Sequence, residues 1–496
     1  MNMLPFVVTL ITAFSVTSLY AQPAGNLKIV RGNVDTVCHS PHILVGVTTP
    51  GNTVTLNGEN VHVYTTGSFG KEIPLTPGNN EIIISTSPGN DVAVLHVFYD
   101  TSGKRTAGSP SQAARPGITP VNLPLLTTDG AYLNYGNGTD RLGGAKINFL
   151  DKGIRLQAIG ETESLYQVRL SGNRYAFIPK VLTEITGTTS GTSTVPTTLS
   201  GSWSVSNAGR YDRVRISLDE KRPYIIQHEV NPGKLVVELF GVYCNSNWIT
   251  QYRNLEAIEN VDVTGADSDV MRVTINLRNQ TYWGYSVEYE GNTLVIDVKH
   301  APQPALKNLT IGVDAGHGGP DGNGAVSAAG YKEKDQNLAM ALMLKELLEK
   351  RGARVILSRD GDYEKNNLLR VKEFKEKNID LLISIHCNAG GNPLKTGGAS
   401  TYYHHIEHRE LARHILARVL ELKGVQNFGL VGNFNFTLNS PTDFPSVLVE
   451  TLFMSNLWDE EQITDPVFQR KMMRQVVKGL EDYLKYCRQS RIRYRY

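Results

Sequence analysis

Apolar residues repeat with two different periods along this chain, and the change falls near Leu306. Before it, short β-rich runs alternate with turns; residues 53–56, for example, lead into Asn57-Gly58, a strong hairpin signal. After it, apolar strands alternate with amphipathic helices. This division predicts a multidomain protein with three small all-β domains, followed by a C-terminal α/β domain whose mixed sheet is flanked by helices.

Two low-complexity segments and one proline-rich stretch set the predicted domain boundaries. Residues 101–119 are rich in Ser, Gly, Ala and Pro, and residues 185–201 are mostly Thr, Ser and Gly. Neither segment can bury enough apolar surface to fold, so both are predicted to be linkers. The third boundary is the Pro-containing stretch 301–305. The predicted parts are β domains at 27–100, 120–184 and 202–300, the α/β domain at 306–486, and a basic tail at 487–496.

The first 21 residues are predicted to form a signal peptide. Residues 6–20 are almost uncharged and apolar but shorter than the about 20 residues that span a bilayer, and they end at Ala21-Gln22. The segment before them lacks the usual Lys or Arg, and no Cys follows the cleavage point to carry a lipid anchor. No later stretch is apolar for long enough to span a membrane. We therefore expect an exported protein without a transmembrane segment.

Charge and cysteine content exclude two classes of protein. The 50 Lys and Arg residues nearly balance the 48 Asp and Glu residues, which excludes a globally basic nucleic-acid binder, and we expect no nucleic-acid partner. The four cysteines lie far apart, so they form neither a CxxC metal pair nor a dense disulfide framework.

Four side chains that can bind metal or transfer protons fall at strand ends or in loops of the predicted α/β sheet. His317 follows the first strand among glycines, Glu333 precedes the next helix, and His386 and Glu450 end two later strands. Each alone has an ordinary interpretation: a loop histidine, a helix-dipole carboxylate, a core histidine and a surface carboxylate. As a group, two His and one Glu form the ligand set of an open catalytic zinc site, and the further Glu supplies its proton acceptor.

The sequence around these residues resembles the zinc-dependent N-acetylmuramoyl-L-alanine amidases of the amidase_3 family. The matching blocks, in the family's order between 306 and 484, are VDAGHGG, GYKEKDQNLA, VILSRDGD, ISIHCNA and FPSVLVETLFMSN. The resemblance implies that His317, Glu333 and His386 hold one Zn²⁺ per chain and that Glu450 is the catalytic residue. Cys387 replaces the family's Ala; because neighbouring strand residues face opposite ways, we expect a buried thiol there rather than a metal ligand.

The resemblance also implies a reaction, hydrolysis of the amide between N-acetylmuramic acid and L-alanine in peptidoglycan. Zinc lowers the pKa of its water from about 16 to about 7, and Glu450 would move a proton to the leaving amine. Asp314 is a candidate for orienting His317 or for shaping the turn, and Asn388 is a candidate substrate contact or loop cap. Two other functions stay open, an inactive wall-binding scaffold and a zinc peptidase that cuts within the stem peptide.

The three β domains carry looser resemblances. Residues 27–100 resemble Ig-like domains of bacterial extracellular enzymes, 120–184 resemble a bacterial SH3-like barrel, and 202–300 resemble the AMIN domain that precedes some bacterial amidases. These likenesses imply wall or septal targeting of an enzyme in the periplasm or at the cell surface of a bacterium. Spacer domains without a ligand are the alternative.

Two further segments receive predictions of their own. His404, His405 and His408 form an HHxxH cluster, which we expect to be a solvated face rather than a metal site. Septal amidases with an AMIN domain commonly carry a helix that plugs the zinc site between the second His block and the catalytic Glu. Here residues 387–449 must already hold a strand and the predicted helix 407–422, which leaves no room for another stable helix of about 12–15 residues. The spacing therefore predicts an open zinc site.

Overall fold

The computed structural model describes residues 27–102, 117–139, 142–187, 197–246, 248–267 and 269–490. The predicted signal peptide, most of the two predicted linkers and the last six residues of the predicted tail lie outside these ranges. The chain divides into two compact units, residues 1–100 and 101–496, which are described separately. Among the described residues, no helix combines the length and apolar character needed to cross a membrane.

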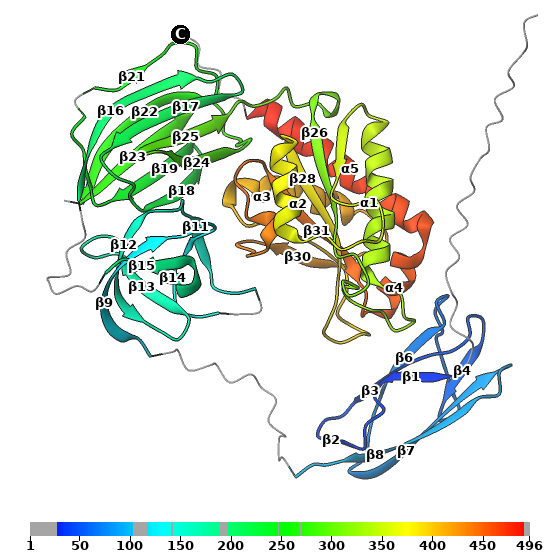
Figure 1. Ribbon diagram of the computed structural model, residues 1–496. Helices are drawn as coiled ribbons and strands as arrows, with labels where there is room; N and C mark the ends of the chain where they lie inside the picture. Colours follow the sequence, from blue (N-terminus) through cyan, green and yellow to red (C-terminus); the bar gives the residue numbers. More distant parts are fainter. Residues whose placement is uncertain are drawn as a thin grey trace, which may run out of the picture. The chain divides into compact units, whose positions relative to one another are not determined.

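The first unit holds the first β module (residues 28–99), in which two sheets enclose one apolar core (Figure 1). The strand orders are β1-β3-β6 and β2-β8-β7-β4-β5. Asn57 and Gly58 have φ of 48° and 81°, which matches the predicted hairpin between β4 and β5. The strands are β1 (Lys28–Arg31), β2 (Thr36–Val37), β3 (His42–Val47), β4 (Thr53–Leu56), β5 (Glu59–Val61), β6 (Ser68–Ile73), β7 (Gly78–Ser87) and β8 (Val92–Tyr99).

The second unit begins with the second β module (residues 119–185), a single antiparallel sheet in the order β11-β10-β14-β13-β12-β9-β15. Its elements are β9 (Thr119–Thr127), β10 (Tyr132–Asn134), β11 (Lys146–Phe149), β12 (Arg155–Glu161), β13 (Leu165–Arg169), β14 (Tyr175–Pro179), the 3-10 turn η1 (Lys180–Leu182) and β15 (Thr183–Ile185).

The third β module (residues 198–299) has two sheets in its described part. One runs β20-β16-β17-β25-β24, with β21 also paired to β16, and the other runs β18-β19-β23-β22. The strands are β16 (Thr198–Asn207), β17 (Tyr211–Leu218), β18 (Tyr224–Val230), β19 (Gly233–Phe240), β20 (Val242–Tyr243), β21 (Thr250–Gln251), β22 (Ile258–Asp267), β23 (Val270–Leu277), β24 (Tyr285–Glu290) and β25 (Thr293–Lys299).

The second and third β modules share one continuous apolar core. Polar contacts also join them: the Asp151 carboxylate accepts hydrogen bonds from the Tyr224 hydroxyl at 3.2 Å and from the Tyr289 N–H at 3.1 Å. Asn148 donates to the Tyr224 carbonyl at 3.2 Å. The boundary between these modules therefore resembles a domain interior more than a flexible joint.

The α/β module (residues 306–489) contains the predicted mixed sheet, in the order β27-β26-β28-β31-β29-β30. Neighbouring strands are parallel except for β29, which runs antiparallel to β31. The elements are η2 (Leu306–Asn308), β26 (Thr310–Ala315), α1 (Glu333–Glu349), β27 (Arg354–Leu357), α2 (Asn367–Glu376), β28 (Leu381–Asn388), β29 (Ala399–Tyr402), η3 (Ile406–His408), α3 (Arg409–Val419), β30 (Asn427–Val431), η4 (Thr437–Asn439), β31 (Ser446–Phe453), α4 (Leu457–Thr464) and α5 (Pro466–Gln489).

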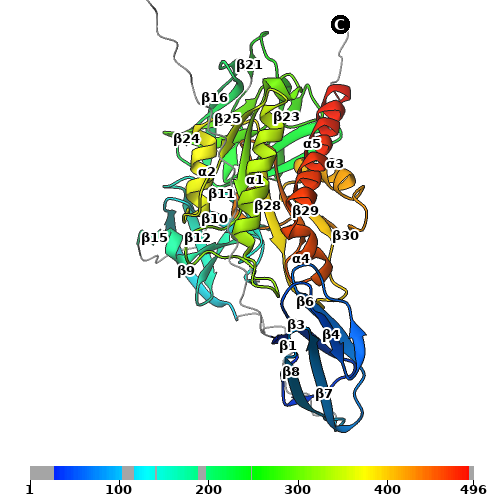
Figure 2. The same cartoon turned by 90° about the vertical axis from the view of Figure 1, so that its right-hand side faces the viewer.

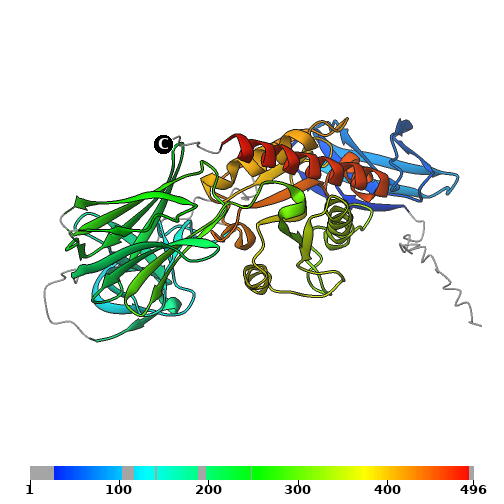
Figure 3. The ribbon, with the colours of Figure 1, turned by 90° about the horizontal axis from the view of Figure 1, so that it is seen from above.

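Helices cover both faces of this sheet. The helices α1, α3 and α5 pack on one face, where Val313, Ile383 and Val449 point into the larger core (Figure 2). The helix α2 lies on the opposite face (Figure 3). There Phe374 and Leu382 form a second, smaller core with Leu438 of the turn η4. Because side chains alternate along a strand, the neighbours of Val313, Ile383 and Val449 point toward the face covered by α2. The candidate site described below lies at the end of that face.

The third β module is packed directly against the α/β module. The Lys299 ammonium donates to the Ile379 carbonyl at 2.7 Å and lies 3.2 Å from the Asp380 carboxylate. At Gly284, where φ is +124°, a Cβ atom would lie 2.0 Å from the Asp443 carbonyl oxygen. Only glycine allows so close an approach of the two backbones.

Candidate metal centre

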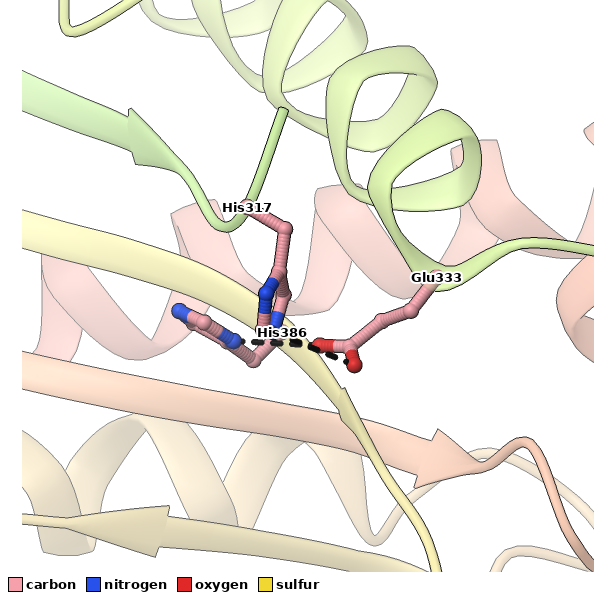
Figure 4. A group of neighbouring side chains, drawn as sticks. All are labelled: His317, Glu333 and His386. Atoms are coloured by element: carbon pink, nitrogen blue, oxygen red, sulfur yellow. Dashed lines mark hydrogen bonds and ion pairs between the residues drawn. The ribbon is translucent and has the colours of Figure 1, made fainter. Parts of the chain in front are cut away.

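His317, Glu333 and His386 converge at the carboxyl ends of β26 and β28 (Figure 4). The His317 Nε2 atom lies 3.2 Å from Glu333 Oε2, and the His386 Nδ1 atom lies 3.1 Å from Glu333 Oε1. Among the described residues, they form the one group of three or more His, Cys, Asp or Glu side chains whose ligand atoms all lie within 4.8 Å of one another. The structure therefore brings together the three residues predicted to hold the metal.

Glycines leave the space that these side chains occupy. A Cβ atom on Gly316 would lie 2.3 Å from the His386 ring, and one on Gly324 would lie 2.5 Å from Glu333 Oε2. His317 itself has a φ of 63°, in the left-handed region that non-glycine residues rarely adopt. Strained backbone of this kind concentrates at functional sites. The local backbone thus fits a compact metal site.

Two buried arginines hold the turn that carries His317. The Arg359 guanidinium donates to the carbonyls of Ala315 and Gly316, both at 2.9 Å. The Arg370 guanidinium donates to the carbonyls of Ala315 at 2.8 Å and His317 at 2.6 Å. Because a guanidinium presents several donors in a fixed plane, each arginine fixes more than one peptide of the turn.

Asp314 acts on this turn through Arg370. Its carboxylate accepts hydrogen bonds from Arg370 at 2.9 Å and from the Ser384 hydroxyl at 2.6 Å. Burial works against ionisation of Asp314, but the charges of Arg370 and His386 together with hydrogen bonds from serine hydroxyls outweigh it and lower the pKa of the carboxyl group. The predicted candidate Asp314 is thus connected to His317 through the His317 carbonyl group.

The Glu333 side chain is held in its ionised form, which is the form that binds a metal cation. Burial works against ionisation, but hydrogen bonds from His317 and His386 outweigh it and hold the pKa of Glu333 well below its ordinary value. Burial works to lower the pKa of His386, but the Glu333 carboxylate, together with the charges of Glu450 and Asp314, outweighs that effect and raises the pKa. Two imidazoles around a carboxylate that stays ionised are a suitable donor set for a divalent metal such as zinc.

Glu450 lies next to this group without being part of it. In the register of the parallel strands β28 and β31, Glu450 stands directly beside His386. On its other side it is paired with Ser400 of β29. Since Val449 points into the larger core, Glu450 faces the same side of the sheet as His386. A carboxylate is thereby placed beside the three-donor group, and its catalytic role stays a prediction.

Cys387 and Asn388, the two residues that follow His386, contact neighbouring protein groups rather than the three predicted metal ligands through their side chains. Cys387 is buried, with its Sγ atom 3.3 Å from the Thr451 hydroxyl, and burial raises the pKa of its thiol well above the ordinary value. The expectation of a buried thiol is confirmed. The Asn388 side chain accepts from the Ala389 N–H at 2.8 Å and donates to the Tyr402 hydroxyl at 3.2 Å. These contacts correspond to the loop-capping alternative for Asn388.

The prediction of a solvated face at His404, His405 and His408 is wrong. His408 is only 2% exposed, and His405 Nε2 lies 2.9 Å from the Ser440 carbonyl oxygen. The third β module covers this cluster. His228 of β18 packs on η3, and its ring centroid lies 5.9 Å from that of His405. The cluster is therefore part of an interface.

Glu407 lies in the same interface, and its titration gives a testable prediction. Its carboxylate is 3.2 Å from His228 Nε2, and burial raises the pKa of Glu407 from 4.5 to about 8 while it lowers that of His228 to about 4. Between pH 4.5 and about 8, the Glu407 carboxyl group is ionised in the unfolded chain but still protonated in the folded chain. The free energy of unfolding therefore falls as pH rises through this range. Glu407→Gln should therefore raise the melting temperature by a few degrees at about pH 8 and leave it nearly unchanged at about pH 5. An equal shift at both pH values, measured by calorimetry, would contradict this assignment.

Sequence reasoning missed several residues that shape the centre. Asn337 donates to Glu333 Oε1 at 3.1 Å from one helical turn further along α1, a four-residue spacing that could have revealed it. Arg359 lies within the VILSRDGD block and was not singled out. No sequence pattern indicated that Arg370 contributes to the site, because a charged residue on a short helix is usually exposed to solvent.

A mixed α/β sheet with two His at its strand ends and a Glu at the start of the adjoining helix is an arrangement typical of metal-dependent hydrolases. The family model for N-acetylmuramoyl-L-alanine amidase, Amidase_3, matches residues 311–482, and the AMIN domain model matches residues 203–309. This chain belongs to the Amidase_3 family of N-acetylmuramoyl-L-alanine amidases and carries an AMIN domain.

Three curated relatives match between 36% and 40% of this chain. The chain is 31% identical over 182 residues to the uncharacterized protein YqiI of Bacillus subtilis, covering 36% of this chain and 86% of that protein. It is 32% identical over 200 residues to the N-acetylmuramoyl-L-alanine amidase LytC of the same species, 39% of each chain. It is 31% identical over 204 residues to the probable cell wall amidase LytH of Staphylococcus saprophyticus, 40% of this chain and 67% of that protein.

Solved structures give a similar result. The CwlD amidase from Clostridioides difficile, in complex with the GerS lipoprotein, is 32% identical with a TM-score of 0.33, covering 36% of this chain and all of that chain. The amidase AmiC2 of Nostoc punctiforme is 28% identical with a TM-score of 0.34, covering 36% of this chain and 97% of that chain.

Proposed function

We propose that this protein is a peptidoglycan hydrolase that cleaves the amide bond between N-acetylmuramic acid and the L-alanine of the stem peptide, with one Zn²⁺ per chain. The observation that carries the proposal is the group His317, Glu333 and His386 with Glu450 beside it on the neighbouring strand. Membership of the amidase family and the relatives named for cell wall amidase activity support the same reaction.

The chain's own residues divide the work of this reaction. When bound by the three donors, zinc supplies a Lewis acid that activates water and polarises the amide carbonyl. Glu450 accepts the proton of the attacking water and delivers it to the leaving amine of L-alanine. Asp314 and Arg370 hold the backbone turn, which fixes the orientation of His317.

We further propose that the enzyme acts outside the cytoplasm of a bacterium, because its substrate lies there and its N-terminus has the pattern of a signal peptide. The first β module is proposed to be Ig-like and the second SH3-like, with the third as the AMIN domain. In this proposal the β modules direct the enzyme to the wall or septum. The stretch 389–445, described throughout, contains α3 as its one α-helix, which supports a metal site without a separate plug.

A product assay tests the proposed reaction directly. Purified peptidoglycan is incubated with the full-length protein, with and without a metal chelator, and the released fragments are identified by mass spectrometry. We expect stem peptides with a free L-alanine amino terminus, released only without chelator. Fragments that retain L-alanine on muramic acid would indicate a peptidase, and no chelator-sensitive release would indicate a wall-binding scaffold.

A further inference from the structure

A short aromatic segment, Phe434-Asn435-Phe436, lies against the candidate metal centre. The Phe436 ring meets the His386 ring edge to face, with centroids 5.7 Å apart and planes at 88°. Phe434 lies 5.9 Å from Phe436 and 4.6 Å from Tyr402, the residue whose hydroxyl accepts a hydrogen bond from Asn388. The segment therefore forms part of the surface against which the His386 imidazole packs.

Regular secondary structure contributes little to holding the segment, which lies between β30 and η4. Its backbone donates from Phe434 to the Tyr403 carbonyl at 3.0 Å and from Phe436 to the Phe434 carbonyl at 2.8 Å. The Phe436 carbonyl accepts from the Asn439 N–H at 3.0 Å and from the Ser440 hydroxyl at 3.1 Å. Both phenylalanines are half-buried. All of these hydrogen bonds are to neighbouring loops and turns of the α/β module, so a contact with another module adds a separate restraint on the position of the segment.

Asn435 provides such contacts, and they reach into another module. Its side-chain amide donates to the carbonyl of Leu142 at 3.1 Å and to that of Gly144 at 2.7 Å, both in the second β module. The acceptor loop lies close to the strand β10 of its own module, because a Cβ atom on Gly144 would lie 2.8 Å from the Asn134 side chain. The Asn435 amide group thus donates to two backbone carbonyls of a module more than 290 residues away in sequence.

We propose that Asn435 is a positioning residue through which the second β module holds Phe434 and Phe436 against the metal ligand His386. The inference rests on the proposed amidase function for its catalytic readout. It gives the second β module a part in shaping the active site, in addition to any role in binding the wall. The module lies outside the matches to both family models, which begin at residue 203.

The test compares full-length, zinc-loaded variants at two asparagines. Asn435→Ala removes both hydrogen bonds, and Asn435→Asp keeps the shape but replaces the donors with oxygens that face two carbonyls. Asn148→Ala is the matched control, because Asn148 also donates across a module boundary, to the Tyr224 carbonyl at 3.2 Å, but within the β modules. Backbone amide exchange of residues 432–440, zinc content and kcat/KM on a soluble muropeptide are measured for each variant.

Both Asn435 variants are expected to exchange faster in residues 432–440 and to lose about tenfold in kcat/KM, with zinc still at one per chain. Asn148→Ala should resemble the wild type in both measurements. Unchanged exchange in the Asn435 variants, or the same increase in Asn148→Ala, would overturn the proposal. If the wild-type protein hydrolyses no muropeptide, the proposed function is wrong, and the exchange comparison still decides whether Asn435 positions the segment.

Discussion

Glu450→Gln is expected to fold, to retain zinc and to lose about 10²- to 10⁴-fold in turnover. The substitution keeps the size of a side chain that stands beside His386 in the sheet register, but it removes the group that accepts and returns a proton. Zinc should stay bound, because Glu450 is not among the three residues whose ligand atoms converge. Turnover on muropeptide and metal content are measured on the same preparation.

A matched control for this variant is Glu376→Gln at the exposed end of α2, which should keep wild-type activity. If Glu450→Gln lost its zinc together with its activity, Glu450 would be a metal ligand, and its assignment to proton transfer would be wrong.

His317→Ala and His386→Ala are expected to lose zinc and, with it, all measurable activity. Each variant leaves two protein donors, and an open catalytic zinc site uses three. Metal analysis of the purified variants provides the measurement, with His96→Ala in the first β module as a control, since the His96 side chain is 75% exposed. Stoichiometric zinc in either site variant would overturn the proposed ligand set.

A second variant tests the same centre while keeping all three donors. Gly316→Ala would place a methyl group 2.3 Å from the His386 ring, so it should weaken zinc binding by displacing that ring. Gly172→Ala adds the same methyl group where no atom lies within 4 Å and should bind zinc normally. Equal zinc affinity in the two glycine variants would show that the ring tolerates displacement.

The metal centre could be predicted from the sequence because its residues stand at the ends of strands in one parallel sheet. Parallel strands bring their carboxyl ends to the same edge, so His317 and His386 had to approach one another once β26 and β28 paired. Glu333 lies at the same edge because it begins α1, the helix that follows β26 in the chain and so starts near the carboxyl end of that strand. Separation of about 70 residues in sequence was no obstacle to this inference.

The environment of His404–His408 and Asn435 could not be predicted in the same way. The histidine cluster contacts the third β module, and Asn435 contacts the second β module. The period of apolar residues predicts which face of a strand or helix is buried, but it does not predict which module covers that face. Arg370 looks like a surface residue, and only the folded chain brings it to the His317 carbonyl.

The continuous core of the second and third β modules also bears on how such proteins can evolve. Recombination that moved either module alone would leave the buried side chains of its former neighbour in water, and the product would be prone to aggregation. These two modules are therefore expected to be inherited as a pair. The first β module encloses its own core within residues 28–99, so it contains the apolar packing of a separate folding unit and is expected to be inherited as one.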